Sequence, residues 1–236
     1  MKRFLIALFL LSVAHSAIGA PSRIVVLRHG EKENAYALCD VGQQRSLALK
    51  AQYLGKGAEK SLFPHAAPTA FFAITLHTLE LVAPSADSWG LPVMTYSVVP
   101  LPGMSDAAST DWLNRQTQRA ATEVMNDSRW RGQTVVMAWE HKHIANQKLE
   151  KNNPDALVEL RELLKLDQLP EADKKRVPKT WSGSNYNFFW IIDYNDSGQP
   201  VAFKEIRQDF TGQFSSVPNN AWDAPEGLSK NSRCKQ

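Results

Sequence analysis

Short apolar runs rich in β-branched residues recur along the chain and predict the strands of a sheet. These runs lie at residues 24–28, 70–74, 93–99, 134–138, 188–192 and 201–206. The first runs are mostly apolar and do not alternate with polar residues, which is typical of parallel strands that are buried on both faces. The last two flank an Asn-Asp-Ser-Gly turn signal and indicate a closing antiparallel hairpin.

Apolar residues at helical spacing fill the stretches between these runs. One helix is expected at 41–54, with an inward face formed by Leu47, Ala48, Ala51 and Leu54. A second is expected to run to Met125, with an inward face of Leu113, Ala120 and Val124 and a cap supplied by Ser109, Thr110 or Asp111. A third is expected to be capped near Asn153 and to begin at Pro154, carrying Leu157, Leu160, Leu163 and Leu164. Alternating strands and helices favour an α/β fold: a three-layer α/β/α domain with a mostly parallel central sheet and a C-terminal antiparallel hairpin.

The N-terminal segment does not fit this alternation. Lys2 and Arg3 precede an apolar run at 4–14, and small residues follow at Ala17, Gly19 and Ala20. This is the pattern of a secretory signal peptide, and the run is too short to span a bilayer comfortably. The alternative is an uncleaved anchor. We expect residues 1–20 to be removed and residues 21–236 to form a single periplasmic or secreted domain without a membrane span.

Loss of that segment brings the net charge close to zero. The whole chain has 27 Lys and Arg against 24 Asp and Glu, a formal charge of +3. Without Lys2 and Arg3 the balance is 25 against 24, or +1. This balance gives no electrostatic reason to expect nucleic acid as a partner.

Two cysteines, Cys39 and Cys234, would remain in a compartment that permits disulfides. Either they bridge and hold the C-terminal tail against the segment after the first strand, or they are unrelated thiols. The sequence leaves both alternatives open, because it does not show whether the two cysteines are close enough and oriented to form a disulfide.

Two predicted strands end close to a histidine. The run 24–28 leads directly into His29, and the run 134–138 leads through Trp139 and Glu140 into His141. Ligands of such sheets bind beyond the carboxyl ends of the strands, so we expect the two imidazoles to meet there over one anion. A neutral imidazole can attack phosphorus, and a neighbouring guanidinium offers forked donors to phosphoryl oxygens.

The stretch Leu27-Arg28-His29-Gly30-Glu31 resembles the signature of the histidine phosphatase (phosphoglycerate mutase-like) superfamily. Residues 38–46 resemble its helix-opening pattern, and Trp139-Glu140-His141 resembles the second motif of a divergent branch. The resemblance covers about residues 24–206. It implies a phosphohistidine at His29, a stabilising role for His141, a phosphate-binding role for Arg28, a small phosphorylated substrate and no cofactor. Arg45, within the helix-opening pattern, is expected to be structural.

The chain departs from the superfamily pattern at a phosphate-binding position. His77 stands where an arginine is usual, and a neutral imidazole gives one donor in place of a charged fork. Loss of such a contact typically costs about 2–4 kcal/mol of transition-state stabilisation. Phosphate affinity should therefore drop near neutral pH unless His77 binds phosphate in its protonated form or another cation, Lys32 or Lys142, replaces the arginine.

The proton donor is the second departure. A leaving alkoxide needs an acid, and Asp106 is favoured because it lies in the loop-like stretch 97–111. Glu31 and Glu140 lie near the histidines and are interpreted as residues that orient their neighbours.

Two further interpretations limit the chemistry. His143 is expected to be structural, and no metal site is expected because no third ligand is evident near His141. The aromatic stretch 181–190 either lines a substrate mouth or packs in the core, and the core is favoured.

These features together predict an exported phosphatase that hydrolyses phosphate monoesters through a phosphohistidine. One alternative is a catalytically impaired superfamily member that binds phosphorylated ligands. A phosphomutase is the third option.

Overall fold

A computed structural model of the protein describes residues 19–228 and 232–235. The signal-peptide prediction falls mainly on residues 1–18, which lie outside the described residues. Within the described part of the chain, no helix has both the length and the apolar character needed to cross a membrane.

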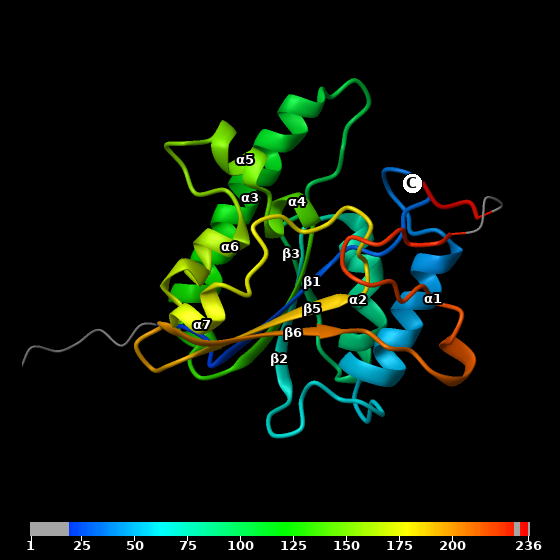
Figure 1. Cartoon of the computed structure of the whole chain (residues 1–236), viewed down its shortest axis with the longest axis horizontal. Coiled ribbons are helices and arrows are strands. Elements are labelled where there is room, and N and C mark those ends of the chain that lie inside the picture. Colours follow the sequence, from blue (N-terminus) through cyan, green and yellow to red (C-terminus); the bar gives the residue numbers. More distant parts are fainter. Residues whose placement is uncertain (1–18, 229–231, 236) are drawn as a thin grey trace, which may run out of the picture.

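Six strands form one mixed sheet in the order β3-β2-β4-β1-β5-β6 (Figure 1). The strands are β1 (Arg23–Arg28), β2 (Pro68–Ala73), β3 (Val93–Thr95), β4 (Thr134–Trp139), β5 (Phe188–Tyr194) and β6 (Pro200–Arg207). The first four pair in parallel, whereas β5 runs antiparallel to β1 and β6 antiparallel to β5. Each apolar run of the sequence therefore contributes a strand to an α/β fold, although the run at 93–99 is shortened.

The helices occupy the connections between these strands. They are α1 (Asp40–Leu49), α2 (Leu76–Ser88), α3 (Asp106–Asn126), α4 (His141–Ile144), α5 (Gln147–Asn152), α6 (Leu160–Leu163) and α7 (Glu171–Lys174). A π-helical turn, Lys50–Leu54, continues α1, and 3-10 turns lie at Ser128–Trp130, Leu166–Gln168 and Gly212–Phe214.

Hydrophobic side chains pack on both faces of the sheet, because successive strand residues point to opposite sides. One cluster joins Val26 and Met137 to Val124 of α3. The other joins the neighbouring Val25 and Val136 to side chains of α1 and α2. In Figure 1, α1 and α2 accordingly lie on one side of the strands, and α3, α6 and α7 lie on the other.

The first two predicted helices form, but with differences. The predicted inward position Leu47 is wrong, since this side chain is 46% exposed. The predicted caps of α3 are also wrong, because the Ser105 side chain accepts a hydrogen bond from the Ala108 amide and starts the helix earlier. Asp106 is therefore the first residue of a helix and not part of a loop.

The predicted helix beginning at Pro154 is wrong. Asn153 instead ends α5, where its side chain donates to the Leu149 carbonyl oxygen. Residues 154–159 are irregular, Leu157 is 52% exposed, and only Leu160–Leu163 are helical. Burial of Leu160 and Leu164 against the α3 side of the sheet replaces the expected continuous apolar face.

Candidate active site

The pairing of β1 with β4 explains why two histidines far apart in sequence converge. Arg28 is in register with Trp139, so the chain leaves both strands at the same edge of the sheet. The His29 amide extends this pairing by donating to the Trp139 carbonyl oxygen at 2.9 Å. His141 begins α4 directly beyond β4. Both imidazoles therefore lie at the carboxyl edge, where α/β folds place their ligands.

Three side-chain nitrogens meet at this point. His29 Nε2 lies 3.2 Å from His141 Nδ1, and Arg28 Nη2 lies 3.1 Å from the former and 3.3 Å from the latter. The Arg28 Nη2 atom carries two hydrogens and can donate one to each imidazole. The structure thus brings together the two histidines and the arginine of the sequence motifs.

The backbone fixes the tautomer of His29. Its Nδ1 lies 2.8 Å from the carbonyl oxygen of Gly30, which can only accept, so Nδ1 carries the proton and Nε2 keeps a lone pair. Burial and the positive charge of Arg28 hold the pKa of His29 well below its usual value. The same two causes lower the pKa of His141 to about 2. Both rings are therefore neutral near pH 7, and His29 presents a nucleophilic nitrogen.

Arg28 is immobilised by a loop on the opposite side of its guanidinium. Its Nη1 donates to the carbonyl oxygens of Ser182, Gly183 and Asn185 at 3.0–3.2 Å. The ring of Tyr186 stacks 3.8 Å from the guanidinium carbon. Because these contacts engage Nη1, the Nη2 atom is the part of the fork directed at the histidines.

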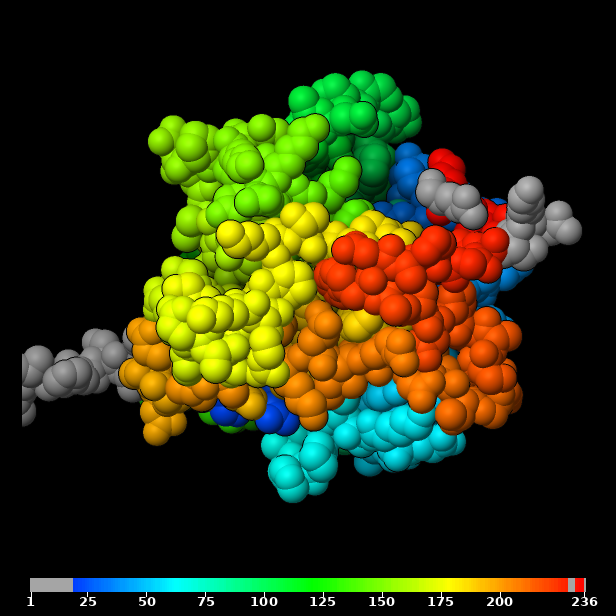
Figure 2. Space-filling model, viewed as in Figure 1, coloured from blue at the N-terminus to red at the C-terminus, as the bar shows by residue number. Residues whose placement is uncertain are grey.

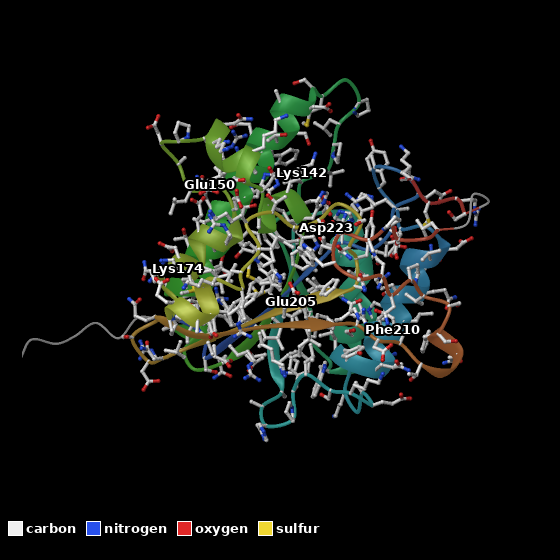
Figure 3. All side chains as sticks on the ribbon, viewed as in Figure 1. Lys142, Glu150, Lys174, Glu205, Phe210 and Asp223 are labelled. Carbon is white, nitrogen blue, oxygen red and sulfur yellow. A yellow bond between two sulfur atoms is a disulfide. The ribbon has the colours of Figure 1, made fainter. Side chains whose placement is uncertain are left out.

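The segment 219–228, here called the C-terminal strap, binds this loop. Asn185 donates from Nδ2 to the Ala221 carbonyl oxygen at 3.0 Å and accepts from the Asp223 amide at 2.8 Å. In Figure 2 the strap lies beside the loop on the surface, and Figure 3 labels Asp223 within it. Farther along, the sulfur atoms of Cys234 and Cys39 are bonded, which joins the tail to the start of α1.

The carboxylate of Glu140 lies beside His29. Its Oε2 is 3.4 Å from His29 Nε2, and its two oxygens accept from Lys32 Nζ at 2.8 and 3.0 Å. The Thr75 hydroxyl donates to Oε1 at 3.2 Å. Burial alone would raise the pKa of Glu140, but the charge and hydrogen bonds of Lys32 outweigh burial and bring the pKa below its usual value, so the group is ionised. Lys32, expected to bind phosphate, is thus paired with a carboxylate in this structure.

His77 and Asp106 lie farther from His29. The His77 ring centroid is 6.4 Å from that of His29, and its Nε2 donates to the Asn34 carbonyl oxygen at 2.8 Å. The Nδ1 atom then has no hydrogen to offer a phosphate. Asp106 is exposed and lines the cavity described next, but makes no hydrogen bond with any described histidine.

A cavity of about 690 Å³ opens beside the cluster. Glu140, His141 and Lys142 line one part of it, and Leu113 and Leu149 contribute apolar surface. Figure 3 shows Lys142 close to α3 and α4. A volume of this size is typical of small-molecule sites and far exceeds that of a phosphate group.

A second ionic cluster lies behind the site and is structural. Arg45 donates from Nη2 to Glu31 Oε1 at 2.6 Å, and from Nη1 to Gln208 Oε1 at 3.0 Å. Burial opposes ionisation of Glu31, but Arg45 lowers its pKa. Burial and a hydrogen bond with Glu31 raise the pKa of Glu226 in the strap to about 9. Arg45 therefore has the structural position expected of it, and Glu31 is committed to this cluster.

The structure supplies the third potential metal ligand that the sequence did not reveal. Ligand atoms of His29, Glu140 and His141 all lie within 4.8 Å of one another. Arg28 and Lys32 place positive charges against the same atoms, which opposes a divalent cation. We therefore assign no metal to these residues. His143 is buried and bonded to Asn114, at 2.9 Å between Nε2 and Oδ1, as a structural residue would be.

Sequence reasoning missed the position of Tyr186. The aromatic stretch around it divides, since Trp181 and Trp190 are buried in the core whereas Tyr186 lies against Arg28, with its ring 5.5 Å from that of His29. No local pattern separates this tyrosine from its neighbours, because the division depends on the path of the loop.

No protein family model matches this chain, and no curated protein matches it in sequence. Several solved structures resemble it at low identity. One is a mycobacterial hydrolase, with 13% identity and a TM-score of 0.41 over 83% of this chain and 93% of that one. Another is mycobacterial glucosyl-3-phosphoglycerate phosphatase, with 13% identity and a TM-score of 0.41 over 81% of this chain and 100% of that one. The structure of that phosphatase in complex with inorganic phosphate has 14% identity and a TM-score of 0.41 over 88% of this chain and 100% of that one. Similarity at this level carries no argument about chemistry, which must come from the site's own atoms.

Proposed function

We propose that the protein hydrolyses phosphate monoesters through a phosphohistidine at His29, as a divergent member of the histidine phosphatase superfamily. One observation carries the proposal: His29 Nε2, His141 Nδ1 and Arg28 Nη2 lie within 3.1–3.3 Å of one another at the carboxyl edge of β1 and β4. This arrangement combines a neutral nucleophile with a fixed positive charge where phosphoryl oxygens would lie.

The reaction has two displacement steps. The lone pair of His29 Nε2 attacks phosphorus, a P–N bond forms, the ester P–O bond breaks, and the alcohol leaves with a proton. Water then attacks phosphorus, loses a proton, and releases inorganic phosphate as the P–N bond breaks. Arg28 stabilises the charge on the equatorial oxygens in both steps, and neutral His141, in the tautomer with its hydrogen on Nδ1, assists by donating to the transferred group.

The cavity beside the cluster accommodates the organic part of the substrate. Its apolar wall at Leu113 and Leu149 and its lysine at Lys142 suit a small organic phosphate with both apolar and polar surface. We therefore favour a small phosphorylated metabolite as substrate.

Export from the cytoplasm is part of the proposal. The charged, apolar and small-residue pattern of residues 1–20 supports it. The bond between Cys39 and Cys234 supports it independently, because structural disulfides persist in oxidising compartments. Fractionation of cells that express the full chain tests it: the processed protein should be found outside the cytoplasm, and a cytoplasmic location would contradict export.

Hydrolysis of p-nitrophenyl phosphate by the processed protein tests the catalytic proposal. His29→Ala should lower kcat by at least about a hundredfold, because it removes the nucleophile. His65→Ala is the matched histidine control, since His65 is exposed and lies outside the cavity. Wild-type turnover by His29→Ala would overturn the mechanism.

A second candidate is a binding module for phosphorylated ligands without turnover. The observation that favours it is His77, which stands where a charged donor is expected and has its only hydrogen engaged by Asn34. This candidate requires phosphate-ester binding that weakens in Arg28→Ala and His141→Ala, with no hydrolysis by the wild type. Affinity that is unchanged in both variants would contradict it.

A further inference from the structure

Three carboxyl groups compete for the role of proton donor and acceptor in this site, and their surroundings differ. Glu31 is buried and bonded to Arg45 through both of its oxygens. Asp106 is exposed at the start of α3 and lines the cavity without contacting either catalytic histidine. Glu140 alone among these three lines the cavity and also approaches the nucleophile, at 3.4 Å from His29 Nε2.

Glu140 is held at this position by donors that a phosphate group also needs. Its oxygens accept from Lys32 at 2.8 and 3.0 Å and from Thr75 at 3.2 Å. The side chain is only 14% exposed, so its charge acts in surroundings of low dielectric constant. The carboxylate therefore occupies, as an internal anion, the place beside Nε2 where phosphoryl oxygens would lie.

We propose that Glu140 is the acid–base residue of this site: it protonates the leaving oxygen in the first step and takes the proton from water in the second. The inference rests on the proposed phosphatase function and replaces Asp106 as the expected acid. The Trp-Glu-His arrangement then places the acid–base residue immediately before the second catalytic histidine.

Substrate binding favours the protonated form of Glu140 that this role requires, and the proton comes from the monoanionic phosphate ester or from solvent. The incoming phosphate takes the Lys32 and Thr75 donors, and its negative charge disfavours an ionised carboxylate beside it. The other charged or titratable groups that face Glu140 are Arg28, His29, His77, His141 and His143. All four of these histidines have pKa values lowered chiefly by burial, so they are poor proton sources near neutral pH.

The proton balance closes over one cycle. Protonated Glu140 gives its proton to the ester oxygen as the P–O bond breaks and the P–N bond to His29 forms. The resulting carboxylate accepts a proton from water as the water oxygen attacks phosphorus and the P–N bond breaks. Glu140 is protonated again when inorganic phosphate forms.

Leaving-group dependence in Glu140→Gln tests this role. The first step with glycerol phosphate needs an acid, because an alkoxide is a poor leaving group. In Glu140→Gln the rate of this step should therefore fall about 10²- to 10⁴-fold. Nitrophenolate leaves without a proton. With p-nitrophenyl phosphate, the rate of the initial burst of nitrophenolate should therefore stay within about tenfold of the wild-type rate. Turnover should then stall with phosphorylated His29, because the second step lacks its base.

Phosphate binding separates catalysis from a merely structural role. Glu140→Gln removes the internal anion but keeps the shape of the side chain, so inorganic phosphate should bind as tightly as in the wild type or more tightly. Glu140→Asp, which keeps a titratable group, should restore part of the turnover of glycerol phosphate. Weaker phosphate binding by Glu140→Gln together with an equal loss of the first-step rate on both substrates would show a structural role and overturn the proposal.

Asp106→Asn is the matched control for the competing carboxyl group. The ratio of its rates with glycerol phosphate and p-nitrophenyl phosphate should equal the wild-type ratio. A large selective loss of the first-step rate on glycerol phosphate in this variant, or no such selective loss in Glu140→Gln, would overturn the assignment. If His29→Ala also remains fully active, the phosphohistidine function fails; if His29→Ala is inactive, only the role of Glu140 fails.

Discussion

Single residues determine which protonation states the site can use. The Gly30 carbonyl fixes the proton of His29 on Nδ1, and Arg28 opposes a second proton on either catalytic ring. In the proposed mechanism His29 can therefore attack without a separate general base, in contrast to a hydroxyl nucleophile, which must lose a proton in order to attack.

The pH dependence of kcat/KM follows from these pKa shifts. Because the pKa of His29 lies well below 6.5, the nucleophile stays unprotonated as the pH falls through that value. We expect kcat/KM for p-nitrophenyl phosphate near pH 5.5 to be no lower than at pH 7. A loss of activity with an apparent pKa near 6.5 would contradict the neutral, buried nucleophile.

Stability must be followed in the same pH series. His29, His141 and His143 have lower pKa values in the fold than in the unfolded chain, where the reference is about 6.5. Their contribution to stability is therefore complete above pH 6.5 and is lost as the pH falls below it, because the unfolded chain binds more protons. Rates are comparable only where a thermal melt shows that the protein is folded.

His77 limits the positive charge available to a phosphate. Burial lowers its pKa and its one hydrogen is donated to Asn34, so His77→Arg should add a charged fork near the cluster. We expect inorganic phosphate to bind about tenfold more tightly or better in calorimetry at pH 7. His77→Gln, which adds a donor without charge, is the control; equal affinity in wild type and His77→Arg would show that the position does not face the ligand.

At the scale of elements, two adjacent parallel strands position the chemistry. The apolar runs before His29 and before His141 were sufficient to predict strands that end at one edge, because pattern and burial agree there. The Pro154 helix was not predictable in the same way, since side-chain capping at Asn153 and burial of Leu160 outweigh the apolar spacing. The start of α3 was missed because several polar residues compete as caps and only one does so.

The site was predictable where it follows the strands and not where it depends on loops. Arg28, His29 and His141 follow from local motifs, whereas the stacking of Tyr186 and the pairing of Lys32 with Glu140 join segments remote in sequence. Such contacts depend on loop paths that hydrophobic spacing does not encode.

The loop at 182–187 should affect phosphate affinity, because it holds Arg28 in position. Asn185→Ala removes the bonds to Ala221 and Asp223 and should cost about 1–3 kcal/mol of stability. Because the Asn185 carbonyl also holds Arg28, inorganic phosphate should bind about tenfold more weakly in calorimetry. Asn187→Ala is the matched control: its side chain binds the same strap but its carbonyl does not contact Arg28. Equal phosphate affinity in the two variants would contradict the positioning role.

At the scale of the whole molecule, the C-terminus closes back onto the first motif. The Cys39–Cys234 bond spans 195 positions, and the Lys235 amide donates to the Lys32 carbonyl oxygen nearby. The disulfide thus closes a ring that contains the strap and the Arg28 loop, and a backbone hydrogen bond attaches the tail to the Lys32 segment.

Removal of this covalent link should destabilise the protein strongly. On the chain-entropy model, a loop of this length corresponds to about 5 kcal/mol, which Cys39→Ser/Cys234→Ser should lose in urea unfolding. The wild type in reducing agent should behave like the double variant, and the double variant should not respond to reducing agent. Equal midpoints for oxidised wild type and double variant would contradict a stabilising link.

The most direct test of the account is chemical trapping of the phosphorylated enzyme. Wild-type protein is quenched during turnover of a phosphorylated substrate, digested without exposure to acid, and analysed by mass spectrometry. We predict an acid-labile phosphoryl group on the peptide that contains His29, and none in His29→Ala. Active turnover without phosphate on His29, or with phosphate on another residue, would contradict it.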